Sequence, residues 1–210
     1  MQRNVALSLS LLLCLVGSRV LAQGFELEDT VSVRFVDREL VAHAATGRTS
    51  RLRFEVGEKL VWQGARGRIG FAVSNRRVFG FRATAGWSAR SLRSGEVSPP
   101  QPALGPRLAL FVTSQRALAY DGKWHQESIG PQERVVQASV GSRVALLVTN
   151  RRALGVAPGA VGFVPTPLGI HEKLESARTI ASSAEVTTTE RLLFFSGPGG
   201  NWTEQDRTRH

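Results

Sequence analysis

Cysteine is almost absent from this sequence: Cys14, near the amino terminus, is the only one. Residues 1–22 have the features of a secretory signal peptide, with a basic residue at Arg3, an apolar run over residues 5–16 and small residues around Ala22. We expect cleavage after Ala22, which removes Cys14 and leaves residues 23–210 as the mature protein. That protein would have no disulfide, no thiol nucleophile and no thiolate ligand for a metal.

Long hydrophobic runs are absent as well. A membrane-spanning helix needs roughly 18 apolar residues, which neither the run over residues 5–16 nor any later stretch provides. Attachment of a lipid to Cys14 is not expected, because Leu13 rather than a small residue precedes it. We therefore expect an extracytoplasmic protein, periplasmic or secreted, that has no membrane span.

Motifs that carry catalysis or bind cofactors are also missing. There is no G-x-S-x-G elbow, no H-E-x-x-H pair and no P-loop. Calcium loops need clustered aspartates, whereas those after residue 22 are far apart in sequence: Asp29, Asp37, Asp121 and Asp206. The histidines are scattered too, at His43, His125, His171 and His210. We interpret them as surface or turn histidines, and we expect no metal, no cofactor and no catalytic residue.

The chain is strongly basic, with 27 lysine and arginine residues, 17 aspartate and glutamate residues and a formal net charge of +10. Nearly all of the positive charge is arginine, because Lys59, Lys123 and Lys173 are the only lysines. A basic surface attracts polyanions such as anionic glycans, lipid headgroups or nucleic acids. An exported protein does not meet chromosomal DNA, so we expect a protein or an anionic glycan as partner and no specific nucleic acid. We also expect the protein to be a monomer.

What the sequence does contain is an internal repeat. An apolar–turn–apolar segment occurs five times, beginning at Phe35, Val73, Val112, Val148 and Thr187, with spacings of 36 to 39 residues. Short polar pairs such as Asn75-Arg76 and Asn150-Arg151 interrupt the segments, which predicts two strands joined by a tight turn. No helical periodicity competes with this pattern after residue 22.

The remainder of each repeat predicts two further strands. A glycine-marked turn precedes an aromatic residue in four repeats, at Trp87, Trp124, Phe163 and Trp202. A glutamate comes later in each repeat but the last, at Glu58, Glu96, Glu133 and Glu172. A new strand begins after each glutamate, so that one repeat holds four short strands.

Several predicted strands are apolar on both faces, for example at residues 110–112 and 146–148. A sheet of this kind must be covered by a neighbouring sheet on each side. Radial stacking meets this requirement, and it predicts an all-β, five-bladed β-propeller of roughly 38-residue, four-stranded blades over residues 23–210 as a single domain. The equal spacing favours a closed ring over an open solenoid, with the inner strand of the first blade at residues 24–28. The pattern resembles β-propeller repeats in general, and it lacks the Gly-His and Trp-Asp pairs of the WD type.

The recurrent aromatic residues have two interpretations. Their rings either stabilise the packing of one blade on the next, which is the favoured interpretation, or serve as platforms for sugar rings, one per blade. The candidate ligand-binding residues are these aromatics and two arginines at hairpin tips, namely Trp87, Trp124, Phe163, Trp202, Arg76 and Arg151.

Arginine also recurs at the start of the third strand of the repeat, and glutamate just before the first strand. Connections at these two places lie at the same end of a four-stranded meander, on strands about 10 Å apart. We therefore predict structural ion pairs, namely Glu58 with Arg77, Glu96 with Arg116, Glu133 with Arg152 and Glu172 with Arg191. In the first repeat Glu39 replaces the arginine and the position of its partner falls in the leader, so both members are missing together.

These patterns favour an exported, non-catalytic β-propeller that acts as a binding or scaffold module for a protein or glycan partner. The alternative is a lectin-like protein that binds glycans at several similar pockets. A propeller hydrolase is less favoured, because nothing in the sequence indicates a nucleophile. Whether the protein is an enzyme stays open from the sequence, with a non-catalytic protein preferred.

Overall fold

A computed structural model describes residues 30–96 and 101–207. The expected signal peptide and the strand expected at residues 24–28 lie outside the described residues. All regular structure within these two ranges is β-strand, in five consecutive antiparallel sheets that correspond to the five repeats. No helix in the described part of the chain is long and apolar enough to cross a membrane.

Each sheet is a meander in which strands adjacent in sequence are hydrogen-bonded neighbours. The first blade contains β1 (Val31–Val36), β2 (Glu39–Ala44) and β3 (Thr49–Arg53), and the second contains β4 (Leu60–Arg66), β5 (Ile69–Ser74), β6 (Arg77–Arg82) and β7 (Gly86–Ser91). The third contains β8 (Ala103–Leu104), β9 (Ala109–Val112), β10 (Arg116–Tyr120) and β11 (Trp124–Ser128). The fourth contains β12 (Val135–Val140), β13 (Ala145–Thr149), β14 (Arg152–Val156) and β15 (Val164–Pro167). The fifth contains β16 (Leu174–Ile180), β17 (Ser183–Thr188), β18 (Arg191–Ser196) and β19 (Asn201–Asp206).

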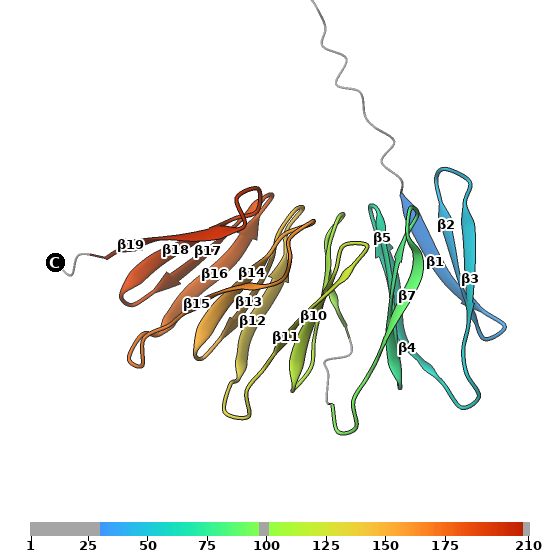
Figure 1. Ribbon diagram of the computed structural model, residues 1–210, viewed down its shortest axis with the longest axis horizontal. Coiled ribbons are helices and arrows are strands. Elements are labelled where there is room, and N and C mark those ends of the chain that lie inside the picture. Colours follow the sequence, from blue (N-terminus) through green and yellow to red (C-terminus); the bar gives the residue numbers. More distant parts are fainter. Residues whose placement is uncertain (1–29, 97–100, 208–210) are drawn as a thin grey trace, which may run out of the picture.

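The fold is therefore an all-β, five-bladed β-propeller, which confirms the fold class predicted from the repeat. Blades stack face to face in chain order, from β1–β3 at the right of Figure 1 to β16–β19 at the left. Neighbouring blades share an apolar core, with representative members, in chain order, Leu40 with Phe79, Phe71 with Phe111, Leu110 with Leu147, and Leu146 with Val186. Strands β5, β9, β10 and β13 are buried along their whole length, so the interior sheets bury both faces.

The first and fifth blades differ from the three blades between them. Burial alternates along β2 and β17, so each of these sheets packs only one face on a neighbour. The other faces carry exposed polar side chains, including Arg34 and Arg51 on the first blade and Arg178 on the fifth. No apolar core cluster of the described residues joins the fifth blade to the first, and Figure 1 shows the two at opposite ends of the row.

The closed ring favoured by the equal spacing of the repeats is therefore not formed by the described residues. Pressing the two terminal faces together would take Arg34, Arg51 and Arg178 out of water, and burying a charge is costly unless it finds a partner. A polar outer face is what the terminal repeats of an open array need to stay soluble. The described blades thus form an open row whose ends are capped by polar faces.

Two glycines at the same position of the repeat allow adjacent blades to approach closely. A Cβ atom at Gly80 would lie 2.5 Å from the ring of Tyr120, and one at Gly155 would lie 2.5 Å from the ring of Phe195. Both rings are fully buried and belong to the following blade. Glycine at these positions therefore leaves room for a large aromatic ring in the adjacent core.

We expect Gly80→Ala to lower the free energy of unfolding by about 1–3 kcal/mol, because the added methyl group must displace the buried Tyr120 ring. Gly162→Ala is the matched control, since a Cβ atom there meets nothing within 4 Å. Urea denaturation of both variants measures the difference. Equal stability of the two variants would show that the Tyr120 ring can move aside without loss of packing.

Candidate functional site

The meander topology places the turns of every blade at two opposite edges. The turns between second and third strands, such as β5–β6 and β9–β10, share one edge with the connections between blades, which we call the ion-pair edge (lower in Figure 1). The turns between first and second and between third and fourth strands share the other edge, which we call the basic edge (upper in Figure 1). In the first blade, β1, β2 and β3 correspond to the second, third and fourth strands of the other blades, so its β1–β2 turn lies at the ion-pair edge and its β2–β3 turn at the basic edge.

At the ion-pair edge, each recurrent glutamate contacts the recurrent arginine of its own blade. The N···O distances are 2.5 Å for Arg77–Glu58, 2.7 Å for Arg116–Glu96, 2.7 Å for Arg152–Glu133 and 2.8 Å for Arg191–Glu172. Each guanidinium donates through both Nε and Nη2, which is the two-point geometry that makes arginine–carboxylate pairs strong. The glutamate side chains are almost completely buried.

A hydroxyl group completes each pair. It donates to the glutamate Oε1 and accepts hydrogen bonds from backbone N–H groups of the adjacent turn, and it belongs to Ser74, Thr113, Thr149 or Thr188 in blades two to five. The sequence reasoning missed this column, although the signal was present as a hydroxyl residue at the second position of four of the five repeated segments. The motif is thus three side chains that also shape the turn.

The same arginines reach the preceding blade. Arg116 Nη2 donates to the carbonyl of Ser91 at 2.6 Å, Arg152 Nη2 to that of Ser128 at 2.6 Å and Arg191 Nη2 to that of Pro167 at 2.9 Å. Arg152 additionally pairs with Glu127 of the preceding blade at 2.6 Å. One guanidinium therefore connects the first and third strands of its own blade to the last strand of the blade before.

The motif keeps its carboxylates ionised. Burial alone would raise the pKa of Glu58, but hydrogen bonds from Arg77, Ser74 and the Glu55 N–H outweigh it and lower that pKa from 4.5 to about 2. The pKa values of the other three glutamates are likewise lowered: burial opposes the shift, and hydrogen bonds from the arginine, the hydroxyl and a backbone N–H overcome it.

The first blade forms its equivalent turn without any of these three groups. Val36 stands at the hydroxyl position and Glu39 at the arginine position. Asp37 and Arg38 both have positive φ, 48° and 67°, which is the conformation of a two-residue type I′ hairpin. A local backbone turn therefore replaces the side-chain motif at this end of the row.

The recurrent aromatic side chains lie between blades. The indole N–H groups donate to the preceding blade, from Trp87 to Ser50 O at 3.3 Å, from Trp124 to Ser88 Oγ at 3.0 Å and from Trp202 to Val164 O at 2.8 Å. Each indole also packs on an aromatic of its own blade, at centroid distances of 5.2 Å to Phe81, 4.9 Å to Tyr120 and 5.2 Å to Phe195. Phe163 packs against the core shared by the third and fourth blades. These contacts are those of packing wedges.

Arg76 and Arg151 lie apart from the aromatic residues, at exposed hairpin tips of the ion-pair edge. Arg76 donates to the carbonyl of Val56 at 3.3 Å, and Arg151 donates to Oε1 of Gln132 at 2.9 Å. The structure does not bring the six candidate ligand-binding residues together into one site.

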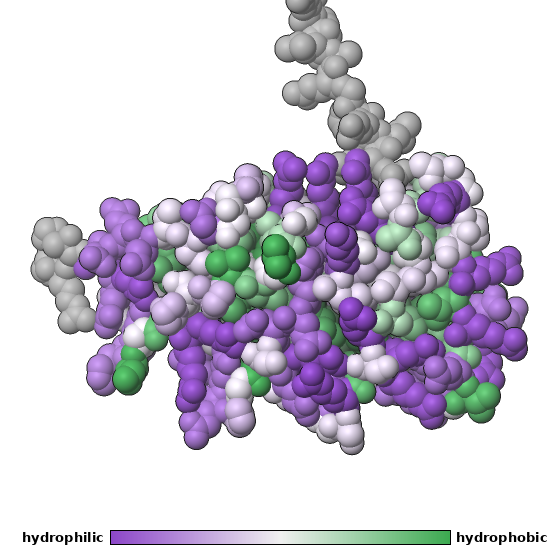
Figure 2. Space-filling view, in the orientation of Figure 1, coloured by the Kyte–Doolittle hydropathy of each residue, from purple (hydrophilic) through white to green (hydrophobic). Residues whose placement is uncertain are grey.

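The described part of the basic edge contains more basic than acidic residues. Its described turns and the strand residues next to them contain seven basic residues, namely Arg48, Arg66, Arg68, Arg82, Arg107, Lys123 and Arg143, and Asp121 is the one acidic residue among them. Asp121 is buried. Figure 2 shows hydrophilic side chains gathered on this upper edge above the middle blades. An edge of this kind attracts anions.

Several of these arginines are held in place by the following blade. Arg48 donates to Ala83 O at 2.7 Å, and Arg82 donates to Asp121 O at 2.6 Å. Both bonds run from the third-to-fourth turn of one blade to that of the next. The positive groups are therefore positioned along the edge rather than free to swing away from it.

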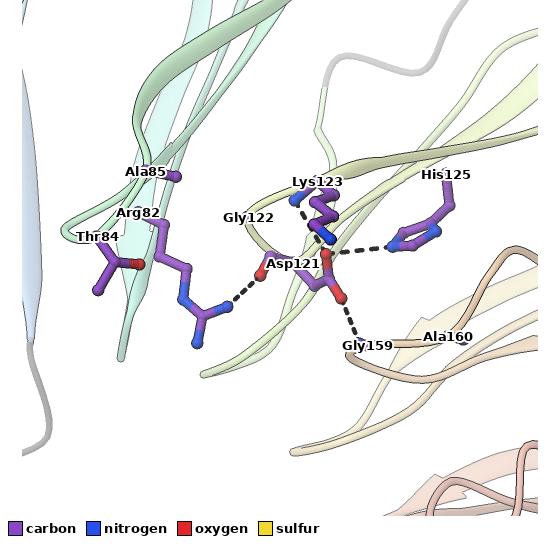
Figure 3. Close-up of a pocket in the computed structure, with 9 residues that line it drawn as sticks. All are labelled: Arg82, Thr84, Ala85, Asp121, Gly122, Lys123, His125, Gly159 and Ala160. Atoms are coloured by element: carbon purple, nitrogen blue, oxygen red, sulfur yellow. Dashed lines mark hydrogen bonds and ion pairs between the residues drawn. The ribbon is translucent and has the colours of Figure 1, made fainter.

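A pocket of about 270 Å³ lies on the basic edge where the turns of the second, third and fourth blades meet (Figure 3). Asp121 organises it: Oδ2 accepts from Gly159 N at 2.6 Å, Oδ1 accepts from Lys123 N at 3.0 Å, and Oδ1 lies 3.1 Å from Nε2 of His125. The expectation of a surface or turn histidine is wrong for His125, which is only 6% exposed.

Asp121 and His125 shift each other's pKa. Burial would raise the pKa of Asp121, but His125 and the Gly159 and Lys123 N–H groups lower it to about 2. The Asp121 carboxylate raises the pKa of His125 above its ordinary value of 6.5. The sequence reasoning missed this pair because it treated each histidine by its repeat position and did not consider a partner four residues away.

A second pocket, of about 180 Å³, lies on the same edge between the fourth and fifth blades. It is lined by Arg107 and Arg143 together with Pro158 and Pro198 and their neighbours Ala157 and Gly197. The basic edge thus contains two hollows that face solvent with basic side chains.

Comparison with known proteins finds only remote likenesses. No protein-family model matches the chain, and no curated protein matches it. Among solved structures, the chain is similar to one chain of the crystal structure of Kap60 bound to yeast RCC1 (Prp20), with 12% identity and a TM-score of 0.41. The match covers 80% of this chain and 54% of that one. BamB from Moraxella catarrhalis has 11% identity and a TM-score of 0.39, with 83% of this chain and 63% of that one covered. The chain therefore spans about half to two thirds of the length of these structures.

We expect Glu96→Gln to cost about 3 kcal/mol of unfolding free energy, because it leaves the Arg116 guanidinium, only 6% exposed, without its counter-charge. Glu185→Gln is the control: the Arg178–Glu185 pair has the same 2.7 Å distance, but Arg178 is 65% exposed, so the loss should stay under about 1 kcal/mol. Chemical denaturation of both variants is the measurement. Losses of similar size would contradict a structural role specific to the motif.

Acid should weaken the protein through the same motif. Because the folded-state pKa of Glu58 is lowered from 4.5 to about 2, its contribution is complete above pH 4.5 and disappears as the pH falls through about 2. We expect the urea midpoint to drop steadily over this interval and Glu58→Gln to flatten the drop. A midpoint that is unchanged between pH 5 and pH 2 would contradict the assignment.

Proposed function

We propose that the protein is an exported, non-catalytic binding or scaffold module that holds an acidic partner, an anionic glycan or an acidic protein, against its basic edge. The observation that carries this proposal is the charge of the described part of that edge, where Arg48, Arg66, Arg82, Lys123 and Arg143 accompany a single, buried acid. At the ion-pair edge, by contrast, each of the four recurrent arginines is paired with a glutamate of its own blade.

Electrostatics explains why one edge is enough to direct a partner. Charges of one sign along a rigid surface add to a potential that raises the local concentration of anionic ligands and speeds their association. The bonds from Arg48 and Arg82 to the following blade fix these charges before a partner arrives. A preorganised charged surface loses little side-chain entropy on binding.

The Asp121–His125 pair has the residue types of a hydrolytic dyad, but its contacts support a structural role. Both carboxylate oxygens of Asp121 accept hydrogen bonds from backbone N–H groups of turns. The bond from Gly159 N to Oδ2 connects the fourth blade to the third. His125 is buried and contacts Asp121. The pair therefore stabilises the meeting point of two blades, which fits a module that binds rather than transforms its ligand.

A lectin-like function at the recurrent aromatics has less support. A sugar platform needs a free ring face, whereas the rings of Trp87, Trp124 and Trp202 pack on aromatics of their own blades and donate to the preceding blade. A monomer is supported by the polar outer faces of the terminal blades, which are suited to water.

The test is the salt dependence of binding by residues 23–210. We expect retention on a heparin-type resin that weakens steeply with salt, and elution of an Arg66→Gln/Arg143→Gln variant, which removes two exposed arginines of the basic edge, at clearly lower salt. The control variant, Arg93→Gln/Arg134→Gln, removes the same charge from exposed arginines of the ion-pair edge.

The two variants separate binding at one edge from general basicity. Equal shifts for both variants, or retention that is insensitive to salt, would refute a binding function of the basic edge. Repeating the experiment with immobilised polyglutamate distinguishes a polypeptide partner from a glycan partner, because only the better-matched polymer should retain the protein to higher salt.

A further inference from the structure

The pocket of Figure 3 is built from three consecutive blades, and one of its two basic side chains, that of Arg82, is held by a hydrogen bond. Arg82 comes from the second blade and donates through Nη1 to Asp121 O at 2.6 Å, while Lys123 comes from the third. Gly122 has a φ of 112°, and a Cβ atom there would lie 2.9 Å from Cδ of Arg82. A glycine is therefore needed at this position for the Arg82 side chain to cross the turn.

The acid in this pocket does not cancel these charges. Asp121 accepts from Gly159 N and Lys123 N, and it is paired with His125. With His125 protonated, the Asp121–His125 pair is neutral overall, so Arg82 and Lys123 give the pocket a net positive charge. The Thr84 side chain, which also lines the pocket, adds a hydroxyl donor.

The pocket also has a size that suits one charged group. Sites that enclose a whole small molecule usually measure about 300–1,000 Å³. This one measures about 270 Å³ and has no large apolar side chain among its lining residues. An arginine and a lysine beside a hydroxyl are the donors that oxyanions prefer, because charge-assisted hydrogen bonds are the strongest that a protein makes.

We propose that this pocket is an oxyanion site, in which Arg82, Lys123 and the Thr84 hydroxyl bind a single phosphate, sulfate or carboxylate group of the acidic partner. The Asp121–His125 pair forms the floor of the site and holds Arg82 in position through the Asp121 carbonyl. This inference rests on the proposed function. It assigns a defined binding site to the basic edge, in addition to a positive electrostatic potential.

A pH dependence follows from the composition of the floor. The groups that face His125 are the Asp121 carboxylate, the Lys123 ammonium and the backbone of Val161. When His125 loses its proton, the Asp121 charge is no longer balanced and the net positive charge of the pocket falls by one. Oxyanion binding should therefore weaken as the pH rises past the folded-state pKa of His125, which lies above 6.5.

The experiment titrates residues 23–210 with sodium sulfate, inorganic phosphate and sodium acetate at constant ionic strength, while amide NMR signals are recorded. We expect saturable shifts at Gly122, Lys123 and Gly159, and roughly tenfold weaker binding for Lys123→Gln, since one charge-assisted contact is lost. Lys173→Gln, an exposed lysine of the ion-pair edge, should bind as the unmodified protein does. The order of the three anions identifies a phosphoryl, sulfated or carboxylate source.

Several outcomes would contradict the proposed oxyanion site. Equal binding by Lys123→Gln and Lys173→Gln, or shifts spread evenly over the surface, would show that the pocket is not the site. Thr84→Val provides a second variant, because Thr84 is exposed and its loss should not disturb folding. Sulfate affinity that is constant from pH 5 to pH 9 would refute the role of His125. Heparin retention that persists in these cases would leave the proposed function standing, so the two failures are distinguishable.

Discussion

The structure depends on one constraint: a sheet that is apolar on both faces cannot exist without a neighbour on each side. Strands β5, β9, β10 and β13 are buried along their whole length, so the second, third and fourth blades require the others. The first and fifth blades satisfy this requirement at each end and present polar faces to water. The outer faces of the described row are therefore mostly polar, as expected of the terminal units of a repeat protein.

Much of this architecture could be predicted from the sequence, because a repeat shows the same side chain in the same environment several times. The ion pairs were expected from topology alone, since the positions of Glu133 and Arg152 follow from which turns share an edge. The recurrent hydroxyl residue, Thr149 in the fourth blade, was also visible in the repeat, but its role was not predicted. The described residues do not close the ring that the equal spacing favoured, and the burial pattern gives the reason: Arg34 and His43 alternate with apolar residues in the first blade, whereas Leu146, Leu147 and Val148 form a continuous apolar run.

The candidate site was harder to foresee, because it does not recur. Asp121 and His125 occur in one blade only, and their significance comes from Gly159, which is 38 residues from Asp121 and is brought to 2.6 Å by the stacking of the next blade. Comparing the repeats with one another detects only residues that recur, so it does not single out Asp121 or His125. The charge of the basic edge was hidden for a similar reason, since its arginines are spread over the chain and meet only when the turns align.

The two edges show how one residue type serves two purposes. At the ion-pair edge, arginine contacts a carboxylate of its own blade and a carbonyl of the preceding blade, so its charge is cancelled and it connects the two blades. Replacing a buried pair by apolar side chains often costs nothing in stability, so the value of this motif lies in specifying one arrangement of blades. At the basic edge, Arg48 and Arg82 reach backbone carbonyls instead, which fix the guanidinium without neutralising it. The identity of the acceptor, carboxylate or carbonyl, therefore decides whether an arginine belongs to the framework or stays available to an anion.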